Sequence, residues 1–111
     1  MTDKIIVFSA CASPEDAEKL ARLLVEQRLA ACVNVVPGAR SYYRWKGAVE
    51  CDAECLLIVK SSRDLFAALA AVLEKAHSYE VPEAVAIPIV EGAANYLNWL
   101  GANLRSGDGQ N

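Results

Sequence analysis

The sequence has few of the residues on which most enzymes and nucleic-acid-binding proteins depend. Its 111 residues include one histidine, six glycines and no glycine-rich phosphate loop. No Ser-His-Asp arrangement can be assembled from them, so we expect no enzymatic activity. Eleven basic residues against 14 acidic ones give a net charge of -3, without any cluster of lysine and arginine. Because phosphate contacts need such clusters, we expect neither nucleic acid nor a membrane as a partner.

Long apolar runs are also missing near the start of the chain. The apolar run at residues 5–8 is too short for a signal-peptide core or a membrane span. We therefore expect a cytoplasmic protein, in which the four cysteines stay reduced. The length fits a single domain over residues 1–105. Residues 106–111 have no apolar side chain and are expected to form a disordered tail.

Strand and helix patterns alternate along this domain. The β-branched run at residues 5–8 predicts a strand buried on both faces. Ser13 and Pro14 predict the start of a helix whose apolar stripe continues to Leu24. Further strands are predicted at 31–36, 42–45, 48–61 and 85–90, a second helix after residues 61–64, and a short C-terminal helix after Gly92. Pro88 predicts that its strand lies at an edge or carries a bulge.

This order of elements predicts an α+β protein with a ferredoxin-like split βαβ sandwich. Its distinguishing feature is an extended β-hairpin, whose arms flank a turn at Lys46-Gly47. Pro37-Gly38 predicts a bulge or sharp bend within the first arm. Both arms are longer than ordinary strands, and a domain this small cannot cover them. We therefore expect the tip to pack against another subunit.

The third strand carries two alternating sets of side chains. Cys51 and Cys55 fall on one face, about 13 Å apart at the rise of a strand, which is too far for one metal ion. We interpret both, and Cys32, as reduced core residues. Glu50, Asp52 and Glu54 fall on the other face, where like charges repel unless a base or a cation lies nearby. Arg40, Arg44 or Lys46 of the first arm is expected to supply that positive charge.

Several segments together resemble the CutA divalent-cation tolerance family. They are residues 29–34, Pro37-Gly38, residues 43–47, Glu54, Lys60-Ser61, residues 77–83 and residues 96–100. The resemblance covers residues 4–105, and its strength comes from the shared order and spacing. It implies a PII-like fold, a tight homotrimer, and a role in tolerance of, and response to, divalent metal ions.

The resemblance also implies a copper site. The family's site combines a histidine of the loop at residues 77–83 with a cysteine at the end of the first strand. His77 matches the loop position, but Ser9 stands where the cysteine is expected. Cys11, two residues along the same face, is a candidate substitute. A histidine that only orders its loop is the alternative for His77. Copper, or another divalent cation, is the expected ligand, and weak binding is expected.

Two further groups of residues are expected at the boundaries between subunits. Tyr43, Glu54, Lys60 and Glu83 are assigned to an inter-subunit cleft, and Tyr42, Trp45 and Trp99 to trimer contacts. The cleft leaves a second functional hypothesis open. In it, the protein is a PII-like signalling module that binds a small ligand or a partner protein between its subunits.

Overall fold

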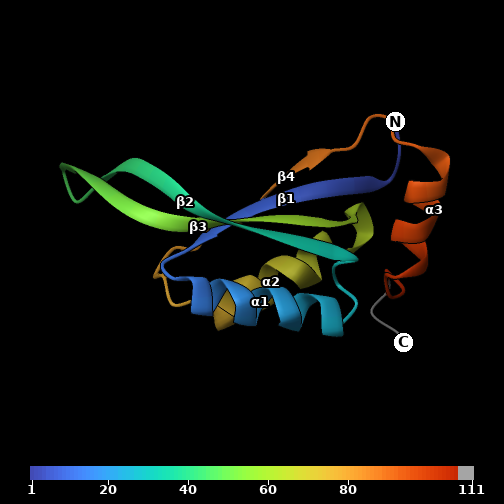
Figure 1. Ribbon diagram of the computed structural model, residues 1–111, viewed down its shortest axis with the longest axis horizontal. Helices are drawn as coiled ribbons and strands as arrows, with labels where there is room; N and C mark the ends of the chain where they lie inside the picture. The colour runs from blue at the N-terminus through green and yellow to red at the C-terminus, as the bar shows by residue number, and fades with distance from the viewer. Residues whose placement is uncertain (108–111) are drawn as a thin grey trace.

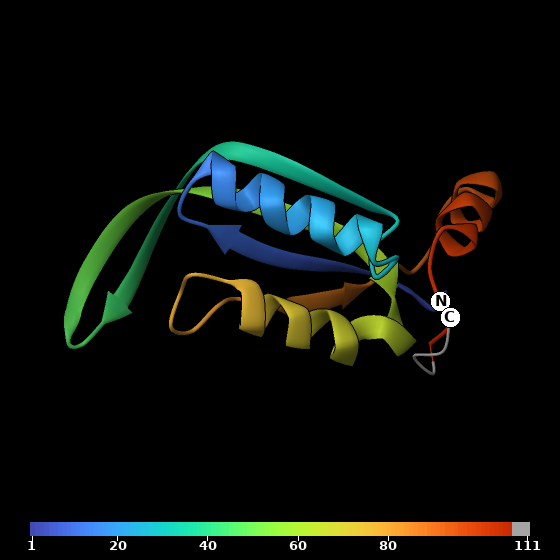
Figure 2. The ribbon, with the colours of Figure 1, turned by 90° about the horizontal axis from the view of Figure 1, so that it is seen from below.

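The computed structural model describes residues 1–107, and it contains one four-stranded antiparallel sheet with two helices packed on one face (Figures 1 and 2). The elements are β1 (Lys4–Cys11), α1 (Pro14–Glu26), β2 (Cys32–Trp45), β3 (Ala48–Ser62), a 3-10 turn (Arg63–Leu65), α2 (Phe66–Ala76), β4 (Val85–Pro88) and α3 (Ala94–Ala102). The strand order β2-β3-β1-β4 is that of the predicted ferredoxin-like, PII-like fold. The fold prediction is confirmed.

The core lies between the sheet and the pair α1 and α2. In β1 and β3, alternate side chains are buried against the helices, as the period of two in a strand requires. The helices contribute leucines at helical spacing, among them Leu20 and Leu24 of α1 and Leu69 and Leu73 of α2. Helix α1 begins as predicted, because Ser13 accepts a hydrogen bond from the backbone N–H of Asp16 at 3.2 Å.

The hairpin of β2 and β3 extends well beyond the helices, and its tip lies at the opposite end of the molecule from α3 (Figure 1). The pairing shifts register between Val36 and Ala39, which confirms the predicted bulge, and Gly38 there has a φ of 87°. At the tip, Lys46 and Gly47 both have positive φ, as in a two-residue type I′ turn. This turn places Trp45 opposite Ala48 and so sets the register of the whole outer hairpin.

Several element boundaries differ from the sequence predictions, and the predicted strands 31–36 and 42–45 form one strand, β2, that continues through the bulge. Helix α2 begins at Phe66, because Ser62 still pairs in β3 and its hydroxyl bonds the Asp64 carboxylate instead of capping the helix. Strand β4 ends at Pro88, two residues early, and it occupies the sheet edge where a proline is tolerated. Of the predicted tail, residues 108–111 lie outside the described residues.

The cysteines are all free thiols, but they are not all buried. Cys11 and Cys55 are buried, Cys32 is half-buried and Cys51 is exposed. The prediction that Cys51 belongs to the core is therefore wrong for this chain on its own. Cys51 does alternate with its acidic neighbours as expected, but it pairs with Tyr42 in the outer part of the hairpin. The outer hairpin extends past the helices (Figure 2). Within residues 1–107, no helix combines the length and apolar character needed to cross a membrane.

Candidate functional site

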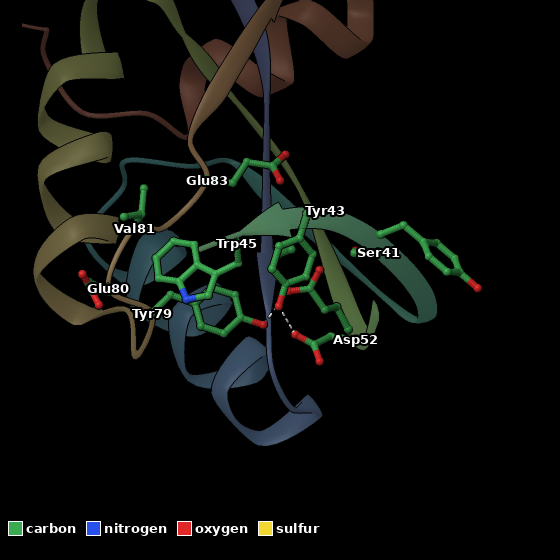
Figure 3. Close-up of a pocket in the computed structure, with 11 residues that line it drawn as sticks. Ser41, Tyr43, Trp45, Asp52, Tyr79, Glu80, Val81 and Glu83 are labelled. Carbon is green, nitrogen blue, oxygen red and sulfur yellow. Dashed lines mark hydrogen bonds between the residues drawn. The ribbon is translucent and has the colours of Figure 1, made fainter. Parts of the chain in front are cut away.

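A cavity lies where the hairpin faces the loop that follows α2 (Figure 3). We call it the hairpin pocket; its volume is about 510 Å³. Its wall contains aromatic rings and carboxylates from both segments: Tyr42, Tyr43, Trp45, Asp52, Glu54, Tyr79, Glu80 and Glu83. No lysine, arginine or histidine is among the described residues that line it. A ligand that carries positive charge suits such a wall, because both carboxylates and ring faces attract cations.

The register of the hairpin decides which side chains share the acidic face of β3. Asp52 lies opposite Ser41, and Glu50 lies opposite Tyr43. Arg40 and Arg44 lie opposite Ala53 and Val49, and so fall on the other face of the hairpin. The prediction that these arginines neutralise the acidic face is therefore wrong.

Tyrosine hydroxyls bond two of these carboxylates. The hydroxyl of Tyr43 donates to Asp52, and that of Tyr79 donates to Glu54 (Figure 3). The hydrogen bond to Asp52 raises the pKa of Tyr43 to about 12. Burial, followed by the hydrogen bond to Glu54, raises the pKa of Tyr79 well above its usual value. Both hydroxyls therefore keep their protons at neutral pH and hold the two carboxylates in place.

The residues assigned to a cleft are only partly gathered within one subunit. Tyr43, Glu54 and Glu83 line the hairpin pocket. Lys60 lies farther along β3, with its ammonium 5.9 Å from the ring centroid of Tyr96 in α3. Sequence reasoning did not single out Tyr79. Its position two residues after His77, in a loop that carries several carboxylates, was the available signal.

A second, smaller cavity of about 220 Å³ is lined by the start of the same loop. We call it the thiol pocket, because Cys11 lines it together with Asp16, Lys19 and His77. The sulfur of Cys11 is 3.8 Å from Nε2 of His77. Strand β1 ends at Cys11 and helix α2 ends at Ala76, and these two ends meet here.

The His77 ring is held by backbone groups at both of its nitrogens. Its Nδ1 accepts a hydrogen bond from the N–H of Tyr79 at 3.1 Å. Its Nε2 lies 2.6 Å from the carbonyl oxygen of Ala10, to which it must donate. The ring is therefore neutral, with its proton on Nε2, and it ties the loop to the end of β1. This arrangement matches the alternative in which His77 orders its loop.

The thiol and the imidazole also fit two ligands of one metal ion. Metal–sulfur and metal–nitrogen bonds of about 2.3 and 2.0 Å place two such donors within about 4.3 Å of each other. A thiolate with an imidazole suits copper, especially Cu(I). Metal binding must displace two protons. One is on the Cys11 thiol, whose pKa is raised to about 11 by burial, with a smaller contribution from Asp16. The other is on Nε2 of His77. In residues 1–107, no group of three or more His, Cys, Asp or Glu side chains is arranged around a metal position.

Ser9, the residue at the implied cysteine position, lies apart from this pair. Its side chain is fully buried, its hydroxyl has no hydrogen-bond partner, and it is absent from the walls of both pockets. Cys11, one step farther along the same face, is the residue that contacts His77.

Large apolar side chains remain uncovered along the hairpin, the outer strand and α3. Tyr42, Trp45 and Trp99, the residues assigned to trimer contacts, are exposed by 68%, 40% and 47%. Val49 at the hairpin and Ile87 in β4 are exposed as well. A monomer rarely leaves so many large apolar groups in water, so these surfaces are suited to contact with other subunits.

Comparison with known proteins identifies the family. Residues 5–103 match the model of the CutA1 divalent ion tolerance protein family. The chain belongs to this family. The divalent-cation tolerance protein CutA of Thermus thermophilus is 49% identical over 98 residues, which cover 88% of this chain and 95% of that protein. The CutA structure from Xylella fastidiosa superimposes with a TM-score of 0.91 at 38% identity, over 94% of this chain and all of that one.

Other CutA proteins differ from this chain in length and in stated location. The chloroplastic CutA of Arabidopsis thaliana is 42% identical over 92% of this chain, but the chain spans only 56% of that protein. A structure from Archaeoglobus fulgidus, at 34% identity, a TM-score of 0.89 and coverage of 92% of this chain and 99% of that one, is described as a periplasmic divalent cation tolerance protein. Members of the family thus occur in different compartments, and the cytoplasmic location of this chain stays a prediction.

Proposed function

We propose that this CutA protein is a non-enzymatic homotrimer that contributes to tolerance of divalent metal ions, in the cytoplasm, by weak binding of copper. The family membership supports the role in metal tolerance. The observation that carries the copper site is the 3.8 Å separation between Cys11 Sγ and His77 Nε2 at the wall of the thiol pocket. Other divalent cations compete less well, since a sulfur–nitrogen pair favours copper over harder ions.

Weak affinity follows from the state of the two ligands. Both donors must lose a proton, and His77 must also give up its hydrogen bond to Ala10. These costs reduce the free energy of binding and make the affinity fall as the pH is lowered. Within residues 1–107 this site has two ligands, Cys11 and His77, so water or a neighbouring subunit would complete the coordination.

A calorimetric titration tests the copper site. Copper is titrated into a Cys32→Ser/Cys51→Ser background, because those two thiols are accessible and would bind copper themselves. We expect His77→Ala and Cys11→Ser to weaken binding to this background at least about tenfold, since each removes one of two ligands. Lys19→Ala, which alters the same pocket without removing a ligand, should leave affinity unchanged. Equal binding by all four proteins would exclude this site.

Light scattering tests the trimer. The uncovered aromatic and apolar groups of the hairpin and α3 support an assembly, which should give three times the 12.0 kDa mass of one chain. Tyr42→Glu should shift the population toward smaller species, because it places a charge at an apolar contact. A mass of 12.0 kDa at micromolar concentration for the unaltered protein would exclude the assembly.

The hairpin pocket supports a second candidate function. A PII-like module would bind a small cationic ligand against its rings and carboxylates, in a cleft that a neighbouring subunit completes. A thermal-shift screen of amines, guanidines and nucleotides tests this function, because a ligand that binds the folded state raises its melting temperature. Glu54→Gln should abolish the shift by a cationic ligand and leave copper binding intact. A screen in which no compound raises the melting temperature would count against it.

A further inference from the structure

Two of the four thiols lie directly opposite each other in the sheet. Cys11 at the end of β1 pairs with Cys55 of β3 in the antiparallel register. Both side chains point to the helix-facing side, where the two residues are buried. Directly opposite residues of antiparallel strands have Cα atoms about 4.5–5.5 Å apart. A disulfide spans about 4.4–6.8 Å between Cα atoms, so this pair can close without a change in register.

The other two cysteines have no such partner. Cys32 lies opposite Lys60, and Cys51 lies opposite Tyr42. Within residues 1–107, Cys11 and Cys55 are therefore the one pair of thiols that the strand register brings together.

The pair also has a route to the outside. Cys11 forms part of the wall of the thiol pocket, although its residue as a whole is buried. His77 lies in the same wall, with its Nε2 3.8 Å from the Cys11 sulfur. A metal ion bound by Nε2 of His77 would therefore lie within bonding reach of the Cys11 sulfur, and Cys55 lies opposite Cys11 in the sheet.

We propose that Cys11 and Cys55 form a redox-active dithiol that reduces Cu(II) to Cu(I) at the thiol pocket. This inference rests on the proposed copper role and adds a chemical activity to it. Two Cu(II) ions, as substrate, accept one electron each from the pair. The two S–H bonds break, one S–S bond forms between Cys11 and Cys55, and two protons pass to water. The products are two Cu(I) ions and a cross-strand disulfide.

The reaction is reversible when a reductant is supplied. A cellular dithiol is that reductant, because it exchanges with the Cys11–Cys55 disulfide and restores both thiols. Closure of the disulfide would also withdraw the Cys11 thiolate from copper, so that the reduced ion is released with His77 as the remaining ligand. The reaction is thus distinct from storage of copper, because each cycle ends with the metal in a different oxidation state.

The test uses the reduced Cys32→Ser/Cys51→Ser protein without oxygen. Two equivalents of Cu(II) are added in the presence of a chromogenic Cu(I) chelator, and the protein is then analysed by mass spectrometry. We expect two chelated Cu(I) ions per chain, a mass lower by two hydrogen atoms, and a peptide that links Cys11 to Cys55. A further Cys55→Ser substitution should abolish the disulfide and slow Cu(I) formation at least about tenfold, because one thiol cannot supply two electrons and close a bond. The Cys11→Ser protein serves as the blank for reduction by the chelator itself.

The outcomes separate this inference from the proposed function. Copper binding by calorimetry, without Cu(I) formation or disulfide, would overturn the dithiol and leave the copper site standing. Absence of both binding and reduction would overturn both. If Cys55→Ser does not fold, the disulfide is mapped in the unaltered chain. A bond that involves Cys32 or Cys51 there, or no bond at all, would also overturn the inference.

Discussion

Two fully buried serines provide a direct test of how this core is stabilised. Ser9 of β1 and Ser61 of β3 both lie on the helix-facing side of the sheet with no exposed surface. The hydroxyl of Ser61 donates to the carbonyl oxygen of Leu29 at 2.7 Å. The hydroxyl of Ser9 has no partner. The same substitution at these two positions should therefore change stability in opposite directions.

The magnitudes follow from hydrogen-bond energetics. A buried polar group without a partner costs about 1–3 kcal/mol, whereas a typical intramolecular hydrogen bond contributes about 1 kcal/mol net. Ser9→Ala removes the unpaired hydroxyl and changes the side-chain volume little, so we expect the free energy of unfolding to rise by about 1 kcal/mol. Ser61→Ala leaves the Leu29 carbonyl without that donor, so we expect a loss of about 1–2 kcal/mol.

Guanidinium unfolding at one fixed protein concentration measures both changes. The concentration must be matched, because assembly would couple stability to it. We expect the midpoints to move apart while the slope with denaturant stays constant, since both proteins expose the same surface on unfolding. A loss of stability in Ser9→Ala similar to that in Ser61→Ala would refute the reasoning, because it would mean that the Ser9 hydroxyl is satisfied in the folded protein.

Three further predictions concern the thiol, the loop and the turn. Burial raises the pKa of Cys11 from 9.0 to about 11. The thiol therefore ionises first in the unfolded chain, and the free energy of unfolding should fall between pH 9 and 11. Urea unfolding should show that this fall is smaller by about 2–3 kcal/mol in Cys11→Ala, and an equal fall in both proteins would contradict the prediction. Tyr79→Phe removes the hydroxyl that donates to Glu54 and should lower the free energy of unfolding by about 1 kcal/mol. Amide hydrogen exchange should become faster in residues 77–83 alone, and unchanged exchange there would contradict the prediction. Gly47→Ala should cost about 1 kcal/mol in the same unfolding assay, because Gly47 has a φ of 83°. Gly101→Ala in α3 is the control, because Gly101 has no positive φ and alanine favours a helix; equal losses in the two variants would contradict the prediction.

The main elements could be predicted because each rests on local signals. The N-cap at Ser13, the β-branched runs and the positive-φ turn residues are all confirmed in place. The bulge at Pro37-Gly38, predicted because proline cannot donate to the strand ladder, is confirmed as well by the register shift. The start of α2 was predicted incorrectly, since a serine followed by an acid also suits the end of a strand, where Ser62 lies.

The wrong face assigned to Arg40 and Arg44 could have been corrected from the sequence. A two-residue turn at Lys46-Gly47 places Trp45 opposite Ala48. Each residue between the bulge and the turn, from 39 to 45, therefore pairs with the β3 residue whose number brings the sum of the two to 93. Arg44 then falls opposite Val49, away from the acidic face. The exposure of Cys51 is a different case. The period of a strand gives the face of each side chain, but not how far the helix layer extends along it.

The contact between Cys11 and His77 depends on tertiary structure that no local pattern fixes. The two residues are 66 positions apart, and they meet because β1 and α2 end at the same side of the molecule. The resemblance to the family pointed to His77, while the strand period pointed from Ser9 to Cys11. Neither the family resemblance nor the strand period predicts that Cys55 lies opposite Cys11, because that pairing depends on the register of β1 against β3.

Glu54 and Cys55 are adjacent in β3, yet Glu54 lines the hairpin pocket and Cys55 lies opposite Cys11, a residue of the thiol pocket. Glu54 accepts from Tyr79 in the hairpin pocket, and Cys55 faces Cys11 behind the thiol pocket. The loop after α2 contributes to both pockets, because Tyr79 lines the hairpin pocket, His77 lines the thiol pocket, and their ring centroids are 4.6 Å apart. Successive strand residues point to opposite faces, so the two side chains can be changed independently. Glu54→Gln and Cys55→Ser should therefore separate cation binding at one cavity from thiol chemistry at the other, and an equal effect of both on copper reduction would show that the loop couples the cavities.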